Sequence, residues 1–175
     1  MLEATAALII ESGYAAVTIA AIAERAGTTK PAIYRRWPSK AHLVHEAVFP
    51  DGESMSLPAS ASFADDVREM LRRTAAAFSE PAARAALPGL LGEITADPTL
   101  HTVLLDRFSA VWVGLDDRLA AAAEAGEVRS NLDPAALLEA ISGSVLMALL
   151  IRTTPTLDDT WIDHTAVLLT KGITP

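Results

Sequence analysis

The chain has 175 residues and a mass of 18.5 kDa, which suits one compact domain or a small module joined to a larger one. That length excludes a large multidomain enzyme. Hydrophobic residues make up 51% of the sequence and charged residues 21%, which is too much apolar material for a disordered chain. Because there is no cysteine, disulfides, thiolate catalysis and cysteine zinc sites are also excluded.

The formal net charge of −8 is unevenly distributed along the chain. Residues 1–50 hold five Lys or Arg and four Glu, a net charge of +1, so the remainder carries −9. All five basic residues lie between Arg25 and Lys40, and no acidic residue interrupts them. One basic segment on an otherwise acidic chain indicates a local contact with nucleic acid. The alternative is an ordinary solvated helix face.

We expect no membrane partner and a cytoplasmic location. The longest uninterrupted apolar run covers residues 145–151, far short of the roughly 20 residues that span a bilayer. The N-terminal residues show no basic region ahead of an apolar stretch, so they do not read as a signal peptide.

Alanine and leucine dominate, and apolar residues recur at spacings of three and four, so an all-α fold is predicted. A first helix over residues 2–12 turns Leu2, Ala6 and Ile9 inward and ends at Gly13. A second, short helix begins after Thr18, a good N-cap, and the next glycine, at position 27, stops it.

Two more helices follow before the first change in composition. Thr28 or Thr29 caps a third helix, which has Pro31 in its first turn and which Pro38 closes. Ser39 caps a fourth helix that runs to residue 48. Residues 50–62 are rich in Pro, Gly, Ser and Asp, which favours a loop and a domain boundary. We therefore expect two domains, residues 1–48 and 49–175.

The second domain is also predicted to be helical. A helix begins at Ser62, and Pro81 and Pro88 bracket a broken stretch after it. Asp97-Pro98 launches a long helix that Gly126 terminates.

Two further helices complete this domain. Asp133-Pro134 starts one that runs to about Thr153. Thr156 or Asp158 caps a last helix over residues 161–169.

Residues 18–37 supply the parts of a DNA-binding helix-turn-helix: a short helix, a tight turn that glycine permits, and an outward helix for the major groove. Ile33 and Trp37 are four residues apart and can face the core, although Tyr34 fits core and surface equally well. Lysine, arginine and threonine can bond base edges, while Tyr34, Arg36 and Lys40 suit phosphates. The remaining candidates for DNA contact are Thr28, Thr29, Lys30, Pro31 and Arg35.

This segment resembles the TetR family of one-component transcriptional repressors, through TIAAIA at residues 18–23, AG at 26–27 and AIYRRWPSK at 32–40. The resemblance covers residues 2–48 and is only architectural beyond them. It implies an all-helical homodimer, with small DNA-binding heads on a larger domain that binds a ligand and forms the dimer. Family residues that match Thr18, Tyr34 and Lys40 commonly touch phosphates, and those that match residues 28–31 commonly meet bases.

Three positions depart from the family pattern. Pro31 replaces a frequent glycine or small residue, and Trp37 replaces the usual phenylalanine. His42 stands near the place where a glutamate would complete a capping box. We expect these changes to alter base preference or local stability without removing the fold.

Residues 135–152 are unusually apolar, and a single chain could cover only part of such a helix. We expect one face to pack inward and the other to join the last helix in a four-helix dimer interface. The alternative is a central core helix. The candidate interface residues are Gly143, Ser144, Ala148, Ile151, Trp161, Ala166 and Leu169.

Apolar and aromatic side chains of the larger domain could line a small-molecule site for an apolar or amphipathic effector, although each could also be plain core. The candidates are Met70, Phe78, Leu91, Ile94, Leu104, Phe108, Val111, Trp112 and Met147.

Enzyme signatures are not found. The four histidines are scattered and lack the partners of a metal set, and there is no glycine-rich phosphate loop or nucleophile elbow. We expect no catalytic residue, no metal and no cofactor. The prediction is a repressor that binds a palindromic double-stranded DNA operator as a homodimer and is released by a small-molecule effector. The alternatives are an activator or chromatin-associated protein without effector release, and a small helical ligand-carrier or enzyme.

Overall fold

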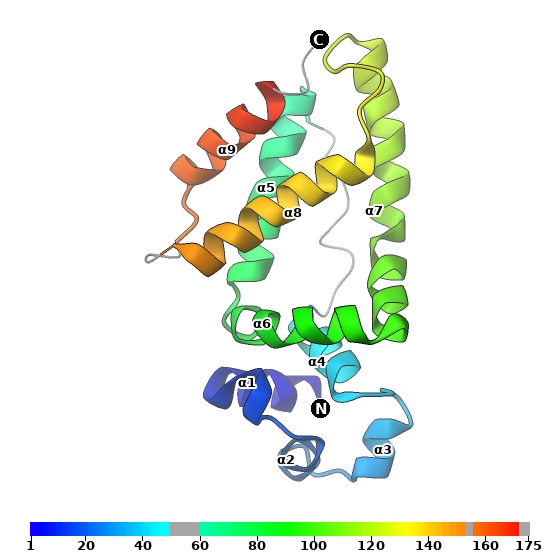
Figure 1. Cartoon of the computed structure of the whole chain (residues 1–175), viewed down its shortest axis with the longest axis vertical. Helices are drawn as coiled ribbons and strands as arrows, with labels where there is room; N and C mark the ends of the chain where they lie inside the picture. The colour runs from blue at the N-terminus through cyan, green and yellow to red at the C-terminus, as the bar shows by residue number, and fades with distance from the viewer. Residues whose placement is uncertain (50–59, 153–155, 172–175) are drawn as a thin grey trace. The chain divides into compact units, whose positions relative to one another are not determined.

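A computed structural model describes residues 1–49, 60–152 and 156–171, without the side chains of residues 103–113. Within these ranges the chain forms helices and no β-strand, which confirms the predicted all-α class (Figure 1). The helices are α1 (Leu2–Ala16), α2 (Ile19–Arg25), α3 (Lys30–Tyr34), α4 (Lys40–Val48), α5 (Phe63–Ser79), α6 (Pro81–Ala96), α7 (Pro98–Glu124), α8 (Pro134–Ile151) and α9 (Asp159–Lys171).

Side-chain caps fix where the short N-terminal helices begin. The hydroxyl oxygen of Thr18 accepts a hydrogen bond from the Ala21 N–H at 3.2 Å and starts α2. Thr29, not Thr28, caps α3 by accepting from the Ala32 N–H at 3.4 Å. Each cap satisfies a backbone donor that has no partner within its helix, so the starts follow from local chemistry.

The turn between α2 and α3 depends on Gly27, whose φ of +61° is a left-handed conformation that side-chain-bearing residues rarely adopt. The Gly27 N–H donates to the Glu24 carbonyl at 3.1 Å, and the Thr28 N–H donates to the Ala23 carbonyl at 2.9 Å. This pair of bonds is a Schellman motif, which closes α2 and redirects the chain.

The third helix is shorter than predicted. It ends at Tyr34 rather than at Pro38, because the Arg36 N–H bonds the Ile33 carbonyl three residues back and tightens the turn. The Trp37 N–H also reaches the Ile33 carbonyl, at 2.9 Å.

The chain divides into two compact units, one formed by residues 1–51 and 80–106 and the other by residues 52–79 and 107–175. In the first unit α6 packs against α1 and α4 (Figure 1). The composition of the sequence sets the predicted boundary at residues 48 and 49, whereas the packing groups α6 with the N-terminal helices. The largest fully buried side chains of its core are Ile9, Ile22, Ile33, Leu43, Leu90 and Leu100.

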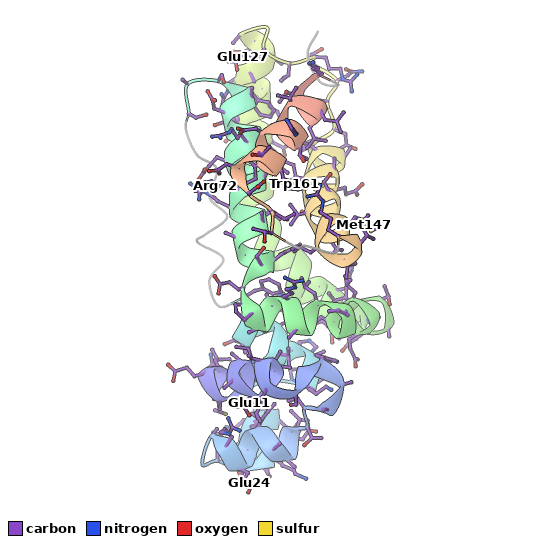
Figure 2. All side chains as sticks on the ribbon, turned by 90° about the vertical axis from the view of Figure 1, so that its left-hand side faces the viewer. Glu11, Glu24, Arg72, Glu127, Met147 and Trp161 are labelled. Atoms are coloured by element: carbon purple, nitrogen blue, oxygen red, sulfur yellow. The ribbon has the colours of Figure 1, made fainter. Side chains whose placement is uncertain are left out.

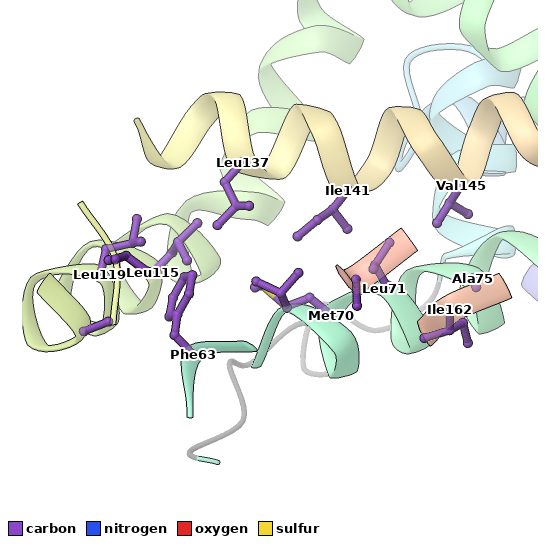
Figure 3. Packing of buried hydrophobic residues seen from close by; sticks show 14 of the residues in the cluster. Phe63, Met70, Leu71, Ala75, Leu115, Leu119, Leu137, Ile141, Val145 and Ile162 are labelled. Carbon is purple, nitrogen blue, oxygen red and sulfur yellow. The ribbon is translucent and has the colours of Figure 1, made fainter. Parts of the chain in front are cut away.

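The core of the second unit lies among α5, α7, α8 and α9. Figure 3 shows Phe63, Met70 and Leu71 of α5 packed with Leu137 and Ile141 of α8. Further members of this cluster are Leu115 and Leu119 of α7, Val145 of α8, and Ile162 and Ala166 of α9.

The start of α5 is fixed by charged groups of the second unit. Asp66 is fully buried, and its Oδ2 lies 2.6 Å from Arg118 Nε. The Phe63 N–H donates to Glu127 Oε2 at 2.5 Å. A buried carboxylate is tolerable only when paired, so the partner Arg118 is needed wherever Asp66 is ionised.

The break expected between Pro81 and Pro88 is wrong, since α6 is continuous and Pro88 lies inside it. Proline removes one hydrogen bond, to the carbonyl four residues back. Both Pro88 and Arg84 are exposed, so water can reach that carbonyl. The buried face of α6, which includes Ala83, Ala86 and Leu90, keeps the helix in place.

The first helix does not end at Gly13 as expected: Gly13 breaks it with a φ of +75°, and α1 continues beyond this kink to Ala16. Other predicted signals are confirmed, and Gly126 closes α7 with a φ of +72°. Asp133 caps α8 by accepting from the Ala135 N–H at 2.9 Å. Asp158, rather than Thr156, caps α9 by accepting from the Trp161 N–H.

Helix α8 is the one described helix that is long and apolar enough to cross a membrane, with a mean hydropathy of 1.9, judged by length and composition alone. Only 28% of that window is buried within the chain. Its buried residues, among them Leu137, Ile141 and Val145, belong to the core of the second unit. A core helix of a soluble protein passes the same test, so the finding is weak evidence for a membrane span.

Glycine substitutions test the conformational role of Gly27. Gly27→Ala should lower the free energy of unfolding by about 1 kcal/mol, because alanine is strained at positive φ. Gly92→Ala, in the open interior of α6, should raise it by up to about 1 kcal/mol through helix propensity. Urea unfolding measures both changes, and a Gly27→Ala variant as stable as the parent would contradict the assignment.

Candidate nucleic-acid interface

Two anchors determine which side of α3 faces outward. Ile33 and Trp37 are 0% and 3% exposed, as predicted, and both belong to the core of the first unit. The indole Nε1 of Trp37 also donates to Glu46 Oε2 at 2.7 Å. Because α3 has only five residues, these two side chains fix its rotation.

The residues on the other side of α3 are exposed together. The sequence allowed Tyr34 to lie either in the core or on the surface. The structure places it on the surface, with 53% of the residue exposed. Lys30 and Arg35 are exposed, and neither forms a hydrogen bond or ion pair within the described part of the chain. The free cation Lys30 and the phenol of Tyr34 therefore lie on α3, and the free cation Arg35 follows directly after it.

The remaining candidates of this segment surround that surface. Pro31 is exposed in the first turn of α3, and Thr28 is half-buried in the turn before it. Thr29 and Thr18 are exposed, and their hydroxyl oxygens already accept capping bonds. Their O–H groups can still donate to an acceptor such as a base or phosphate.

Arg36 is less free than its sequence position suggests. Its Nη2 lies 2.8 Å from Glu46 Oε1, and its guanidinium stacks 4.6 Å from the centroid of the Trp37 ring. The same Glu46 carboxylate thus holds both Arg36 and Trp37. Arg36 remains exposed at its end, with 63% of its side chain accessible, so it can still approach a phosphate.

Arg25, at the end of α2, is paired with Glu11 of α1. Its two terminal nitrogens lie 2.9 and 2.8 Å from the two carboxylate oxygens. These hydrogen bonds lower the pKa of Glu11 and raise the pKa of Arg25. Arg25 is therefore neutralised locally, which the sequence alone did not indicate.

Lys40 begins α4 and is held by Tyr14. Its ammonium donates to the Tyr14 carbonyl at 2.9 Å and lies 4.0 Å from the centroid of the Tyr14 ring. His42 takes the place expected of a capping-box glutamate, with Nδ1 2.9 Å from Ser39 Oγ. The start of α4 therefore combines a local contact between Ser39 and His42, which the sequence suggested, with a tertiary contact between Lys40 and Tyr14, which it did not.

The predicted ligand-site residues are not all placed in one unit. Met70 and Phe78 belong to the core cluster of the second unit, whereas Leu91 and Ile94 lie half-buried on α6 in the first. Met147 is 52% exposed on α8. Four candidates have side chains outside the described residues: Leu104, Phe108, Val111 and Trp112. The described residues hold no group of three or more His, Cys, Asp or Glu that could bind a metal ion.

Some of the predicted dimer residues are buried in the second unit and others are exposed on its surface. Ala148 and Ala166 are buried, at 7% and 6% exposed, and Trp161 and Leu169 pack against the core of the second unit. Gly143 and Ser144 are half-buried, and Ile151 is 71% exposed.

Helices α8 and α9 also expose apolar residues that the sequence analysis did not select for the interface. Figure 2 shows Met147 projecting from α8. The others are Leu150, Val167 and Leu168, which are 50%, 50% and 73% exposed. The missed signal is helix register: Ile162, Ala166 and Leu169 face inward, which turns Val167 and Leu168 outward.

Comparisons with known proteins cover most of the chain. A family model described as "Bacterial regulatory proteins, tetR family" matches residues 1–47, and one described as "Tetracyclin repressor-like, C-terminal domain" matches residues 57–169. The chain is 29% identical over 168 residues to the HTH-type transcriptional regulator Mb1581 of Mycobacterium bovis, which covers 91% of this chain and 79% of that protein.

Two solved structures have the same fold. The TetR family transcription regulator SCO0332 is 27% identical, with a TM-score of 0.69 and coverage of 99% of this chain and 96% of that one. The transcriptional regulator FadR from Bacillus subtilis, solved in complex with stearoyl-CoA, is 17% identical, with a TM-score of 0.66 and coverage of 98% and 97%.

Lys30 is expected to contact a base edge, and its substitution tests that role. Lys30→Ala should relax the preference at one position of a bound DNA site, at a cost of about 1–3 kcal/mol on the preferred sequence. Binding to a panel of single-base variants measures this loss. Arg25→Ala is the matched control, because its partner Glu11 already neutralises it. Equal loss on every DNA variant would assign Lys30 to the backbone instead.

Proposed function

The chain belongs to the TetR family of transcriptional regulators, and on that basis we propose that it is a ligand-responsive repressor. It binds a palindromic operator as a homodimer, and a small apolar or amphipathic effector releases it. The observation that carries the proposal is the outward surface of α3, where Lys30, Tyr34 and Arg35 are exposed without partners in the described chain.

The charge distribution supports DNA as the partner. The segment around α3 contributes free cations, while residues beyond position 50 carry a net charge of −9. The DNA phosphates repel the acidic residues beyond position 50 and attract the cations around α3. These two effects together orient the protein on a duplex. Lys30 and the threonines around it read bases, while Tyr34, Arg36 and Lys40 bind phosphates.

The exposed apolar residues of α8 and α9 support a homodimer. Only 28% of the apolar window of α8 is buried, and α9, which packs against the same helix α5, exposes Val167 and Leu168. Together they leave apolar surface that a second copy would cover. A two-fold dimer presents two α3 helices to successive major grooves, which lie about 34–36 Å apart on one face of the duplex.

The effector is proposed to be apolar or amphipathic because the second unit is built from apolar side chains, such as Phe63, Met70 and Phe78. A protein with the same fold was solved with stearoyl-CoA, an amphipathic molecule. We therefore place acyl chains and their thioesters first among the candidates.

Release follows from linkage between the two ligands. In one form of the dimer, the spacing of the two DNA-binding units does not match the operator. An effector that binds this form better lowers DNA affinity, and DNA lowers effector affinity by the same factor. No step of this scheme makes or breaks a covalent bond, so we propose no catalysis and no cofactor. The protein would act in the cytoplasm, where bacterial DNA is found.

An unbiased selection of bound DNA sequences tests the proposed operator. We expect a recovered palindrome whose half-sites are separated by about one helical turn. The Lys30→Ala/Arg35→Ala double variant should recover no enriched sequence, because it lacks both free cations. Enrichment of a single, asymmetric half-site by the parent chain would contradict the dimeric repressor. Titration of the selected complex with acyl-CoA then separates an effector-released repressor from a regulator without effector release.

The dimer can be tested on the exposed apolar residues. Ile151→Glu/Leu168→Glu should convert the dimer to a monomer at micromolar concentration, because two buried charges would oppose association. Ile10→Glu is the matched control, since Ile10 is 54% exposed on α1 in the other unit. Sedimentation equilibrium measures the mass. A parent chain that is already monomeric at this concentration would overturn the interface.

A further inference from the structure

Tyr14 connects three helices of the first unit. It lies in the last turn of α1, just after the bend at Gly13, and is 8% exposed. Its carbonyl accepts a hydrogen bond from the Lys40 ammonium of α4 at 2.9 Å, and that ammonium also lies over its ring. The third helix is α6, whose backbone at Gly89 meets the same ring.

The two contacts from Tyr14 fix the position of the Lys40 ammonium. A carbonyl oxygen and the negative face of an aromatic ring both attract a cation, and they act here from one residue. An ammonium has three N–H donors, so the Tyr14 carbonyl leaves two for another acceptor. A lysine that is already fixed loses less side-chain freedom when it binds a phosphate.

Helix α6 determines where the Tyr14 ring lies. A Cβ added at Gly89 would lie 2.2 Å from Tyr14 Cδ1, 2.5 Å from Cγ and 2.9 Å from Cβ. No side chain fits at this position, so the ring packs directly on the backbone of α6. A Cβ added at Gly92, three residues further along the same helix, meets no atom within 4 Å.

The Tyr14 hydroxyl is buried beside Glu93, which lies on α6 as Gly89 does. Burial, followed by the charge of Glu93 and hydrogen bonding with it, raises the pKa of this hydroxyl above its ordinary value, so the ring stays neutral beneath Lys40. Helix α6 therefore meets both the ring and the hydroxyl of Tyr14, and Gly89 is the point where its backbone touches the ring.

We propose that Tyr14 is a positioning residue for the DNA contact of Lys40, and that α6 controls this contact through Gly89. A shift of α6 moves the ring, and the ring moves the ammonium that meets the phosphate. The inference rests on the proposed function, because it needs Lys40 to bind a DNA phosphate. It adds a specific route by which a change at α6 alters DNA affinity.

The test is a double-mutant cycle in the full-length chain on the selected operator. Lys40→Ala should weaken binding about tenfold, the size of a lost charged hydrogen bond, and reduce the salt slope by about 0.9 per head. Gly89→Ala should change affinity and salt slope in the same direction, because it displaces the ring. The combined variant should bind no more weakly than Lys40→Ala, since both act through one contact.

Gly92→Ala is the matched control on α6 and should bind as the parent chain does. If Gly89→Ala does not fold, as judged by circular dichroism, Tyr14→Leu replaces it in the cycle, because leucine keeps the carbonyl and a buried side chain but removes the ring face. Tyr14→Phe keeps the carbonyl and the ring and should leave binding unchanged.

Two results would overturn the inference while leaving the proposed function intact. One is parent-like affinity for both Gly89→Ala and Tyr14→Leu. The other is an equal loss from these variants with and without Lys40, which would mean that they act independently of it. An unchanged salt slope for Lys40→Ala would remove the phosphate contact and the inference with it. A parent chain that binds no DNA sequence would instead refute the proposed function.

Discussion

The burial of Ile33 and Trp37 is the constraint on which the proposed DNA-binding surface depends. An isolated helix shorter than about 12–15 residues is marginal in water, so the five-residue α3 exists only because the first unit holds it. Ile33 on α3 and Trp37, three residues beyond its end, anchor one side of this segment in the core. As a result, Lys30 and Tyr34 lie on the side of α3 that is exposed to solvent.

Acidic and aromatic neighbours then decide which cations are available. Glu11 pairs with Arg25, Glu46 pairs with Arg36, and Tyr14 holds Lys40. The basic segment of the sequence is therefore divided into fixed and free charges. Among the fixed cations, Arg36 and Lys40 suit phosphates, whose positions on a duplex are regular, whereas Glu11 neutralises Arg25. The free cations Lys30 and Arg35 can adapt to a base edge.

The parts of the fold that local chemistry determines were predictable from the sequence. Thr18, Ser39 and Asp133 cap the helices they were expected to cap, and Gly27 makes the turn before α3. Contacts between distant residues were not predictable. The packing of α6 with α1, and the continuity of α6 through Pro88, depend on tertiary packing that a single sequence does not show. The outward register of Leu168 likewise depends on which side of α9 meets the core.

The most direct test of the account is an ethylation-interference footprint on the DNA beside the gene for this protein. The account predicts two groups of sensitive phosphates on one face of the duplex, about 34–36 Å apart, each flanking a major groove. One isolated group, or sensitive phosphates spread evenly around the helix, would contradict a dimer that presents two α3 helices to DNA.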